Sequence, residues 1–276
     1  MEEKRQQHRG QGNRKRSVVS NLILIIAVCV FVFSAYKLIS IYSEYHKGER
    51  EYDNIVEDAV EIQRPKEEES EKGEEEQKPK VHVSLKVNFD KLKKVNQDVV
   101  AWIQFDEPKI INYPVVRGDD NDKYLHTTFE GKKNSSGTLF VDANNSGEFA
   151  DRNTFVYGHN MKNGSMFGQL RKYKTKEYYE KNPYFYIYTP DGKEVKYQIF
   201  AVCIVEDISR SYTRFYNNNE EYLGYLKYIK SIANYDTGVE LTMDSKIISL
   251  STCTNESETQ RLLVHGVKIS ESVVGD

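Results

Sequence analysis

The chain has 276 residues and a formal net charge of −3, which argues against the strongly basic surface that nucleic-acid binding usually needs. Its length fits one ordinary domain with appendages, and its 20 Tyr and 12 Phe can supply a sizeable core. Three cysteines, Cys29, Cys203 and Cys253, are an odd number and too few for a disulfide framework. One of them is therefore a candidate for chemistry.

The N-terminus predicts a membrane anchor. Residues 17–36 read SVVSNLILIIAVCVFVFSAY, an uncharged run of about 20 residues that is long enough to cross a bilayer as a helix. Six basic residues precede it, so the positive-inside rule places residues 1–16 in the cytoplasm. A cleaved signal peptide is the alternative, but its apolar core would be shorter and followed by small residues. We expect a retained single-pass anchor over 17–41 with the rest of the chain extracytoplasmic.

A polar segment follows the anchor. Residues 42–80 include PKEEESEKGEEEQKPK, a composition that cannot bury enough apolar surface to fold alone. The part before Pro65 can extend the anchor helix, whereas we interpret the Glu- and Lys-rich part as a charged spacer without a specific partner. We expect the linker over 42–80 and the folded domain over 81–276.

The folded domain begins with a helical pattern and continues with short strands. Apolar residues in FDKLKKVNQDVVAWIQF (89–105) recur at helical spacing, and Pro108 would end that helix. Two more helices are predicted at 167–179 and 220–233. After the first helical pattern the chain contains the β-rich runs IINYPVV, GTLFVD, NTFVYGH, YFYIYT, EVKYQIFAVCIV, KIISLSTC and RLLVHGVKI. Many short strands in one domain predict a mainly β, α+β fold built as a closed barrel or a sandwich.

Cys253 is the candidate nucleophile. It ends the run KIISLSTC, and polar residues surround it, so its thiol can reach solvent. Cys203 lies in the middle of QIFAVCIV, where a buried and inert thiol is expected.

A thiol nucleophile needs a base or a cation that favours the thiolate. His159 follows the strand NTFVYG in the Gly- and Asn-rich loop GHNMKNGSMFG, from which it can turn into a cleft. His126 is a rival that spacing alone does not dismiss. His265 lies inside the last strand, where a structural role is expected.

Arg261 is the candidate for stabilising negative charge. A loop of seven residues separates it from Cys253, and if the two strands pair in antiparallel fashion, Arg261 returns beside the thiol. An arginine there can stabilise the oxyanion of a tetrahedral intermediate. The alternative is a strand-edge arginine paired with Glu256 or Glu258.

Taken together, these motifs resemble the sortase family, and class B within it. SLSTC is followed eight residues later by Arg261 and preceded far upstream by YGHNMKNGSMFG; VNQDVVAWI, INYPVV and NDKYLHTTF are also class B-like. The resemblance covers 88–270. It departs from the family signature TLxTC at Ser249. It implies a catalytic triad of His159, Cys253 and Arg261, and demotes the other two histidines.

The resemblance also implies a fold and an activity. The fold would be a closed eight-stranded β-barrel with peripheral helices, including an N-terminal one at 89–103 and a long one at 220–233. The enzyme would cleave a C-terminal sorting motif (NPxTN-like or related) after Thr in secreted surface proteins, and join them to a peptidoglycan amine through a cysteine thioester. By motif position the substrate groove would be lined by Asn121, Leu125, Ser251, Thr252 and Tyr212. No cofactor or metal is implied.

Two other functions fit parts of the pattern. A cysteine peptidase or amidase of the cell envelope would use the same thiol and imidazole but transfer the acyl group to water. Arg261 disfavours a papain-like arrangement, in which amides hold the oxyanion and the cysteine opens a helix. A non-catalytic wall-binding module would not need Cys253 at all.

Overall fold

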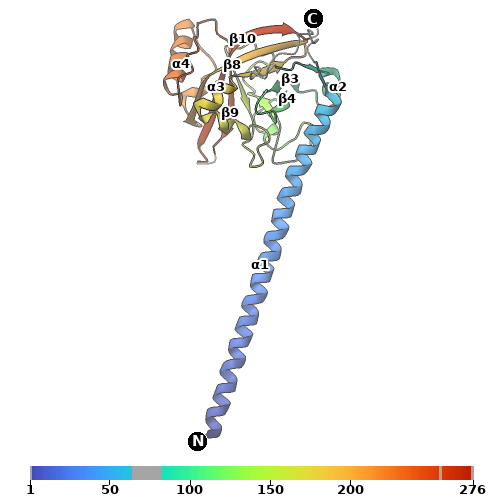
Figure 1. The fold of residues 1–276 in the computed structure, drawn as a ribbon, viewed down its shortest axis with the longest axis vertical. Helices are drawn as coiled ribbons and strands as arrows, with labels where there is room; N and C mark the ends of the chain where they lie inside the picture. Colours follow the sequence, from blue (N-terminus) through green and yellow to red (C-terminus); the bar gives the residue numbers. More distant parts are fainter. Residues whose placement is uncertain (1, 64–81, 255–256, 275–276) are drawn as a thin grey trace, which may run out of the picture. The chain divides into compact units, whose positions relative to one another are not determined.

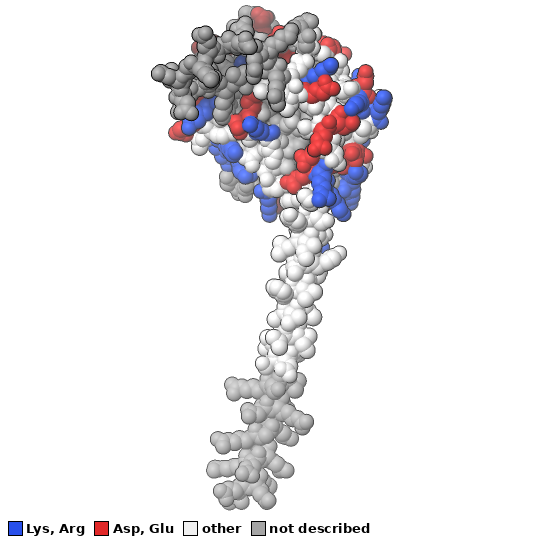
Figure 2. All heavy atoms as spheres, turned by 45° about the vertical axis from the view of Figure 1, so that its right-hand side comes forward, with Lys and Arg blue, Asp and Glu red and all other residues white. Residues whose placement is uncertain are grey.

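The computed structural model describes residues 2–63, 82–254 and 257–274, with side chains from residue 20 onward. It divides into two compact units, 1–47 and 48–276. Helix α1 (Glu2–Ala59) supplies the first unit. Its part from Ser20 is, by length and composition, able to cross a membrane, and Figure 2 shows a long stretch of it without charged side chains. This helix fits the predicted anchor; the side chains of the preceding basic residues lie outside the described part.

The second unit is a closed barrel of eight strands, in the order β10-β8-β7-β3-β4-β5-β6-β9, with β9 pairing back to β10 (Figure 1). The pairs β4–β5 and β6–β9 are parallel and the others antiparallel. The barrel confirms the predicted fold. Its strands are β3 (Val99–Gln104), β4 (Asn112–Val116), β5 (Leu139–Val141), β6 (Asn153–Tyr157), β7 (Tyr184–Tyr188), β8 (Lys193–Glu206), β9 (Ile247–Cys253) and β10 (Gln260–Val273).

Short helices and one longer helix lie outside the barrel. The longer one, α4 (Asn219–Ser231), confirms the prediction for 220–233, and Asn218 caps it by accepting a hydrogen bond from the Glu221 amide. Its apolar face, including Tyr222 and Ile229, packs with Phe200 of β8. The predicted helix 167–179 is instead two pieces that meet at the extended residue Thr175. The remaining helices are α2 (Phe89–Val95), η1 (Lys123–Leu125), η2 (Gly168–Lys174), α3 (Lys176–Lys181) and η3 (Arg210–Tyr212).

The predicted helix over 89–105 is wrong beyond residue 95. Helix α2 ends before Asn96, whose backbone is extended and whose side chain donates to Tyr124 Oη and the Phe129 carbonyl, both at 3.0 Å. Residues 99–104 then form β3 between β4 and β7. Burial of Val99, Ala101, Trp102 and Ile103 in the barrel produced an apolar spacing that a helix would also show, and tertiary pairing decided the outcome.

The predicted linker also begins too early. Residues 48–62 belong to the barrel unit, where Tyr52, Ile55 and Ala59 are buried along one face of α1. Tyr52 Oη donates to the Gly137 carbonyl at 2.6 Å. After α1, strand β1 (Val60–Ile62) pairs with β2 (Leu85–Val87) in antiparallel fashion. These contacts fix 48–62 as part of the folded domain; the Glu- and Lys-rich residues 64–80 lie outside the described residues.

This boundary predicts the stability of two truncated chains. A chain beginning at Gly48 should melt cooperatively, whereas one beginning at His82 loses the burial of Tyr52 and Ile55. Each large buried side chain contributes about 1.5 to 3 kcal/mol, so the shorter chain should melt on the order of 10 °C lower by circular dichroism. Equal melting temperatures for the two chains would show that residues 48–62 add nothing to the domain.

Candidate active site

The site is built from the register of three neighbouring strands. Strand β9 lies between β6, which is parallel to it, and β10, which is antiparallel. Tyr157 of β6 pairs with Ser251 of β9, and the Gly158 amide donates to the Ser251 carbonyl at 3.1 Å. His159 and Cys253 each follow that pair by two residues, so they lie at the same end of adjacent strands.

Arg261 lies at the same end of the barrel, on the other neighbour of β9, strand β10. It pairs directly with Cys253 across the β9–β10 ladder, which confirms the predicted return of the chain. Because neighbouring strands are about 4.8 Å apart, the three residues are placed side by side at one end of the barrel.

Cys253 is the accessible thiol of the barrel domain. The six residues before it in β9 are buried, whereas Cys253 itself is exposed at the strand end. Cys203 is fully buried in β8, and burial raises the pKa of its thiol to about 12, so it is inert at neutral pH as predicted.

The surroundings of His159 fix its protonation. Its Nε2 lies 2.6 Å from the Leu125 carbonyl oxygen, which can only accept, so we assign the proton to Nε2. In the neutral ring Nδ1 then holds a lone pair and can accept a proton. Burial lowers the pKa of His159 from its ordinary value; the Leu125 carbonyl opposes this shift, and the charge of His126 adds to it. The imidazole is therefore neutral at pH 7.

The two demoted histidines have different surroundings. His126 stacks on His159, with ring centroids 6.0 Å apart and planes inclined by 23°, so it influences the charge of that ring. His265 is completely buried, and its Nδ1 lies 2.8 Å from Ser249 Oγ. Burial lowers the pKa of His265 to about 3, in agreement with the expected structural role.

The guanidinium of Arg261 is held at its terminal nitrogens. Nη1 donates to the carbonyls of Glu258 at 2.7 Å and Gln260 at 3.1 Å, and Nη2 lies 3.3 Å from Asp207 Oδ2. Of the acidic partners considered from sequence, Glu258 contributes only its backbone carbonyl, and Glu256 lies outside the described residues. Asp207, at the end of β8, was not predicted.

The residues predicted to line the groove make different contacts, and two of them, Ser251 and Thr252, directly precede Cys253 on β9. Ser251 is buried, and its Oγ is 2.8 Å from Tyr212 Oη. Tyr212 also stacks on Phe155, with ring centroids 5.4 Å apart, so these two contacts hold its ring in place. Asn121 Oδ1 accepts from the Ala143 amide at 2.8 Å, and Leu125 contributes the carbonyl that holds His159.

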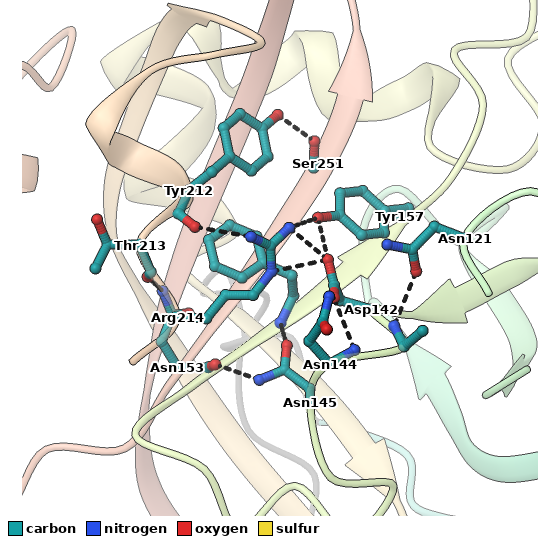
Figure 3. A network of polar contacts seen from close by, with 12 residues as sticks. Asn121, Asp142, Asn144, Asn145, Asn153, Tyr157, Tyr212, Thr213, Arg214 and Ser251 are labelled. Atoms are coloured by element: carbon teal, nitrogen blue, oxygen red, sulfur yellow. Dashed lines mark hydrogen bonds and ion pairs between the residues drawn. The ribbon is translucent and has the colours of Figure 1, made fainter. Parts of the chain in front are cut away.

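Next to Tyr212 lies an ionic network that the sequence did not reveal (Figure 3). Asp142, fully buried at the end of β5, accepts hydrogen bonds from Arg214 Nε at 2.8 Å and Tyr157 Oη at 2.7 Å. Arg214 also donates to the Tyr212 carbonyl at 3.1 Å. Burial alone would raise the pKa of Asp142, but the Asn144 amide, Tyr157 and Arg214 outweigh it and lower that pKa. The network fixes Tyr212 beside β9.

An exposed thiol, a neutral imidazole and a guanidinium at one end of a closed barrel define a cysteine enzyme suited to acyl transfer. Comparisons with known proteins agree. The sortase domain family matches residues 104–269. Sortase B of Listeria monocytogenes is 29% identical over 260 residues, which cover 93% of this chain and 99% of that protein. Sortase B of Staphylococcus aureus is 28% identical over 251 residues, covering 90% and 95%.

Solved structures give the same result. Clostridium perfringens sortase B superposes with a TM-score of 0.62 at 34% identity, covering 66% of this chain and all of that one. Sortase B from B. anthracis in complex with AAEK1 gives 0.66 at 28% identity, covering 83% and 100%. The chain belongs to the sortase family and, within it, to class B, whose members are cysteine transpeptidases.

The Arg214 network makes a prediction about stability. Arg214→Ala leaves the buried Asp142 carboxylate without its cation, which typically costs 3 to 5 kcal/mol. Urea unfolding should show this loss. Arg210→Ala, at an exposed arginine of η3 four residues away, is the matched control and should cost under about 1 kcal/mol. Equal losses for the two variants would contradict a stabilising role for the network.

Proposed function

We propose that Cys253 is the nucleophile, His159 the general acid and base, and Arg261 the group that stabilises the oxyanion. The observation that supports this proposal most directly is the pairing of Arg261 with Cys253 at the end of β9. The neighbouring strand β6 ends beside it, and His159 follows β6 by two residues. All three roles then follow from chemistry that each side chain can perform in its observed surroundings.

The first half-reaction forms a thioester. The Cys253 thiol gives its proton to Nδ1 of the neutral His159, and the sulfur attacks the carbonyl carbon of a Thr in the substrate. A C–S bond forms, and the carbonyl oxygen becomes negative. His159 then returns the proton to the leaving nitrogen, the C–N bond breaks, and an amine product departs.

The second half-reaction regenerates the enzyme. An acceptor amine attacks the thioester carbon and loses a proton to His159. The C–S bond breaks, the sulfur recovers a proton, and a new amide is released. No external oxidant or reductant is required.

Arg261 must turn part of its donor set toward the oxyanion during both steps. Its present partners include two backbone carbonyls near the strand end, which are neutral acceptors. A negatively charged oxygen beside Cys253 is a stronger acceptor for a guanidinium, so the exchange is favourable as charge develops.

We infer the substrates and location from family and composition. The donor is a secreted surface protein with a C-terminal sorting motif, NPxTN-like or related, cut after Thr. Asn121, Leu125, Ser251, Thr252 and Tyr212 line its groove. The acceptor is a peptidoglycan amine. Support comes from solved relatives described as a Staphylococcus aureus sortase B–substrate complex and a sortase B complexed with triglycine. The apolar helix anchors the enzyme with its N-terminus in the cytoplasm and its barrel outside.

The covalent intermediate gives the first functional prediction. With a sorting-motif peptide alone, intact-mass spectrometry should show an acyl group on Cys253 and slow release of free acid. Adding a peptidoglycan-like amine should divert the product to an amide and raise turnover. Cys253→Ala should abolish the adduct, and His159→Ala should nearly do so. If several wall amines at saturating concentration give only the acid, the enzyme is a hydrolase.

A second prediction concerns Arg261. Arg261→Ala should lower kcat/KM for the sorting-motif peptide by about 100-fold or more, as expected for loss of an oxyanion donor. Arg261→Lys keeps the charge but loses the planar fork, so it should restore only part of the rate. Asp207→Asn, which changes the guanidinium's present partner, is the control for a merely structural ion pair. A near-normal rate for Arg261→Ala would rule out the oxyanion role.

A further inference from the structure

One turn of α1 supports both partners of the hydrogen bond between His159 and the Leu125 carbonyl. This turn, residues 49–52, belongs to the barrel unit, and its contacts reach the bond from two directions. One direction leads through the backbone next to Leu125. The other leads through the loop 158–168, which carries His159. The chemistry described above assigns no role to this turn.

Tyr52 supports the backbone that carries the Leu125 carbonyl. Tyr52 is buried, and its Oη donates to the Gly137 carbonyl at 2.6 Å. Gly137 lies directly against η1, because a methyl group added at its Cα would come 2.7 Å from the Leu125 carbonyl oxygen. The amide of the next residue, Thr138, donates to the Tyr124 carbonyl at 3.0 Å. Only Gly137 therefore separates the Tyr52 hydroxyl from the oxygen that binds the imidazole.

Glu49 holds the loop that carries His159. Its Oε1 accepts a hydrogen bond from Asn163 Nδ2 at 2.8 Å. Asn163 Oδ1 accepts from the amide of Ser165 at 3.2 Å and from its hydroxyl at 2.8 Å. The amide group of Asn163 thus uses its oxygen within the loop and its nitrogen toward α1, so this side chain fastens the loop to the helix.

The ring of Tyr52 reaches the same loop through Tyr113. The two rings meet edge to face with centroids 5.3 Å apart, and Tyr113 Oη accepts a hydrogen bond from the Met166 amide at 3.2 Å. Met166 has a φ of 50°, a left-handed conformation that costs free energy in a residue other than glycine, so outside contacts must hold it. The amide of the next residue, Phe167, donates to the His159 carbonyl at 3.0 Å.

We propose that Glu49 and Tyr52 are positioning residues, which act through the two loops to keep the His159 ring in the tautomer that has its proton on Nε2. The inference rests on the proposed role of His159 as general acid and base. The bond to Leu125 selects this tautomer, and Nδ1 can accept a proton only while Nε2 carries one. Because the two partners lie on separate loops, loss of their shared support releases the ring to the other tautomer.

Reversal of one hydrogen bond tests the Glu49 contact. Asn163→Asp keeps both bonds that Oδ1 accepts but places a carboxylate against Glu49. Adding Glu49→Gln restores a donor and an acceptor in reversed order. A misplacement of about 1 Å can cost on the order of 100-fold in rate, and this exposed contact controls part of the loop. In the full chain in detergent, Asn163→Asp should therefore lower kcat about fivefold to tenfold with little change in KM, and the double variant should recover most of it.

A spectroscopic readout separates positioning from a general loss of structure. With ¹⁵N-labelled histidine, the side-chain nitrogen shifts of His159 report which ring nitrogen carries the proton. The unaltered chain should show the proton on Nε2. Asn163→Asp and Tyr52→Phe should each show a mixture of the two tautomers, although both still melt cooperatively by circular dichroism. The double variant Glu49→Gln/Asn163→Asp should return to the Nε2 tautomer.

The outcomes distinguish this inference from the proposed function. Glu57→Gln makes the same charge change at an exposed position two turns further along α1 and should alter neither kcat nor the tautomer. An unchanged tautomer in Asn163→Asp and Tyr52→Phe would overturn the positioning role, with or without a loss of rate. Equal losses in Asn163→Asp and the double variant would overturn the Glu49 contact. Normal formation of the acyl adduct by His159→Ala would overturn the proposed function instead.

Discussion

The position of β9 between a parallel and an antiparallel neighbour is the constraint on which the site depends. The parallel pairing with β6 places His159 and Cys253 at the same end of the barrel. The antiparallel pairing with β10 places Arg261 opposite Cys253. A slip of one residue in either ladder would turn the β9 side chains to the other face. The register of three strands therefore assembles the site, although His159 is about a hundred residues from Arg261 in sequence.

Buried polar contacts hold this register from inside the barrel. Ser249 Oγ donates a hydrogen bond to Asn153 Oδ1 of β6 at 2.8 Å and forms a second hydrogen bond with His265 Nδ1 of β10. The hydroxyl thus connects β9 to both neighbours, four residues before the nucleophile. Ser249 is also the residue at which the sequence departs from the sortase signature. Since a serine still provides a hydroxyl at this point, the departure leaves the link between the strands intact.

Local patterns in the sequence predicted the pairing of residues at the end of β9, which the register confirms; the catalytic roles of these residues remain proposals. Alternation in β9 and the short loop to β10 predicted that Arg261 would face Cys253, because both are properties of a hairpin. The helix over 89–105 failed because burial of Val99, Ala101 and Trp102 within a barrel mimics helical spacing. Local sequence does not specify the neighbours of a strand.

Other features depend on contacts between distant segments. Arg214 and Asp142 are 72 residues apart in the sequence. The residues next to them in the sequence do not indicate that the two side chains form a buried ion pair. Tyr52, Ile55 and Ala59 do recur at helical spacing. The acidic composition of the residues after them nevertheless led to a predicted start of the folded domain at residue 81, which is too late in the chain. His126 was dismissed on family grounds, yet it stacks on His159 and lowers the pKa of that ring.

In the proposed mechanism, strand register brings Arg261 to the oxyanion formed at Cys253. A crystal structure of the barrel covalently bound through Cys253 to a thiol-reactive sorting-motif peptide analogue tests it most directly. We expect the oxygen that mimics the Thr carbonyl to lie within about 2.7 to 3.1 Å of the Arg261 guanidinium, with His159 Nδ1 facing the sulfur. An oxygen held by other groups, with Arg261 still bound to Asp207 and the Glu258 carbonyl, would contradict it.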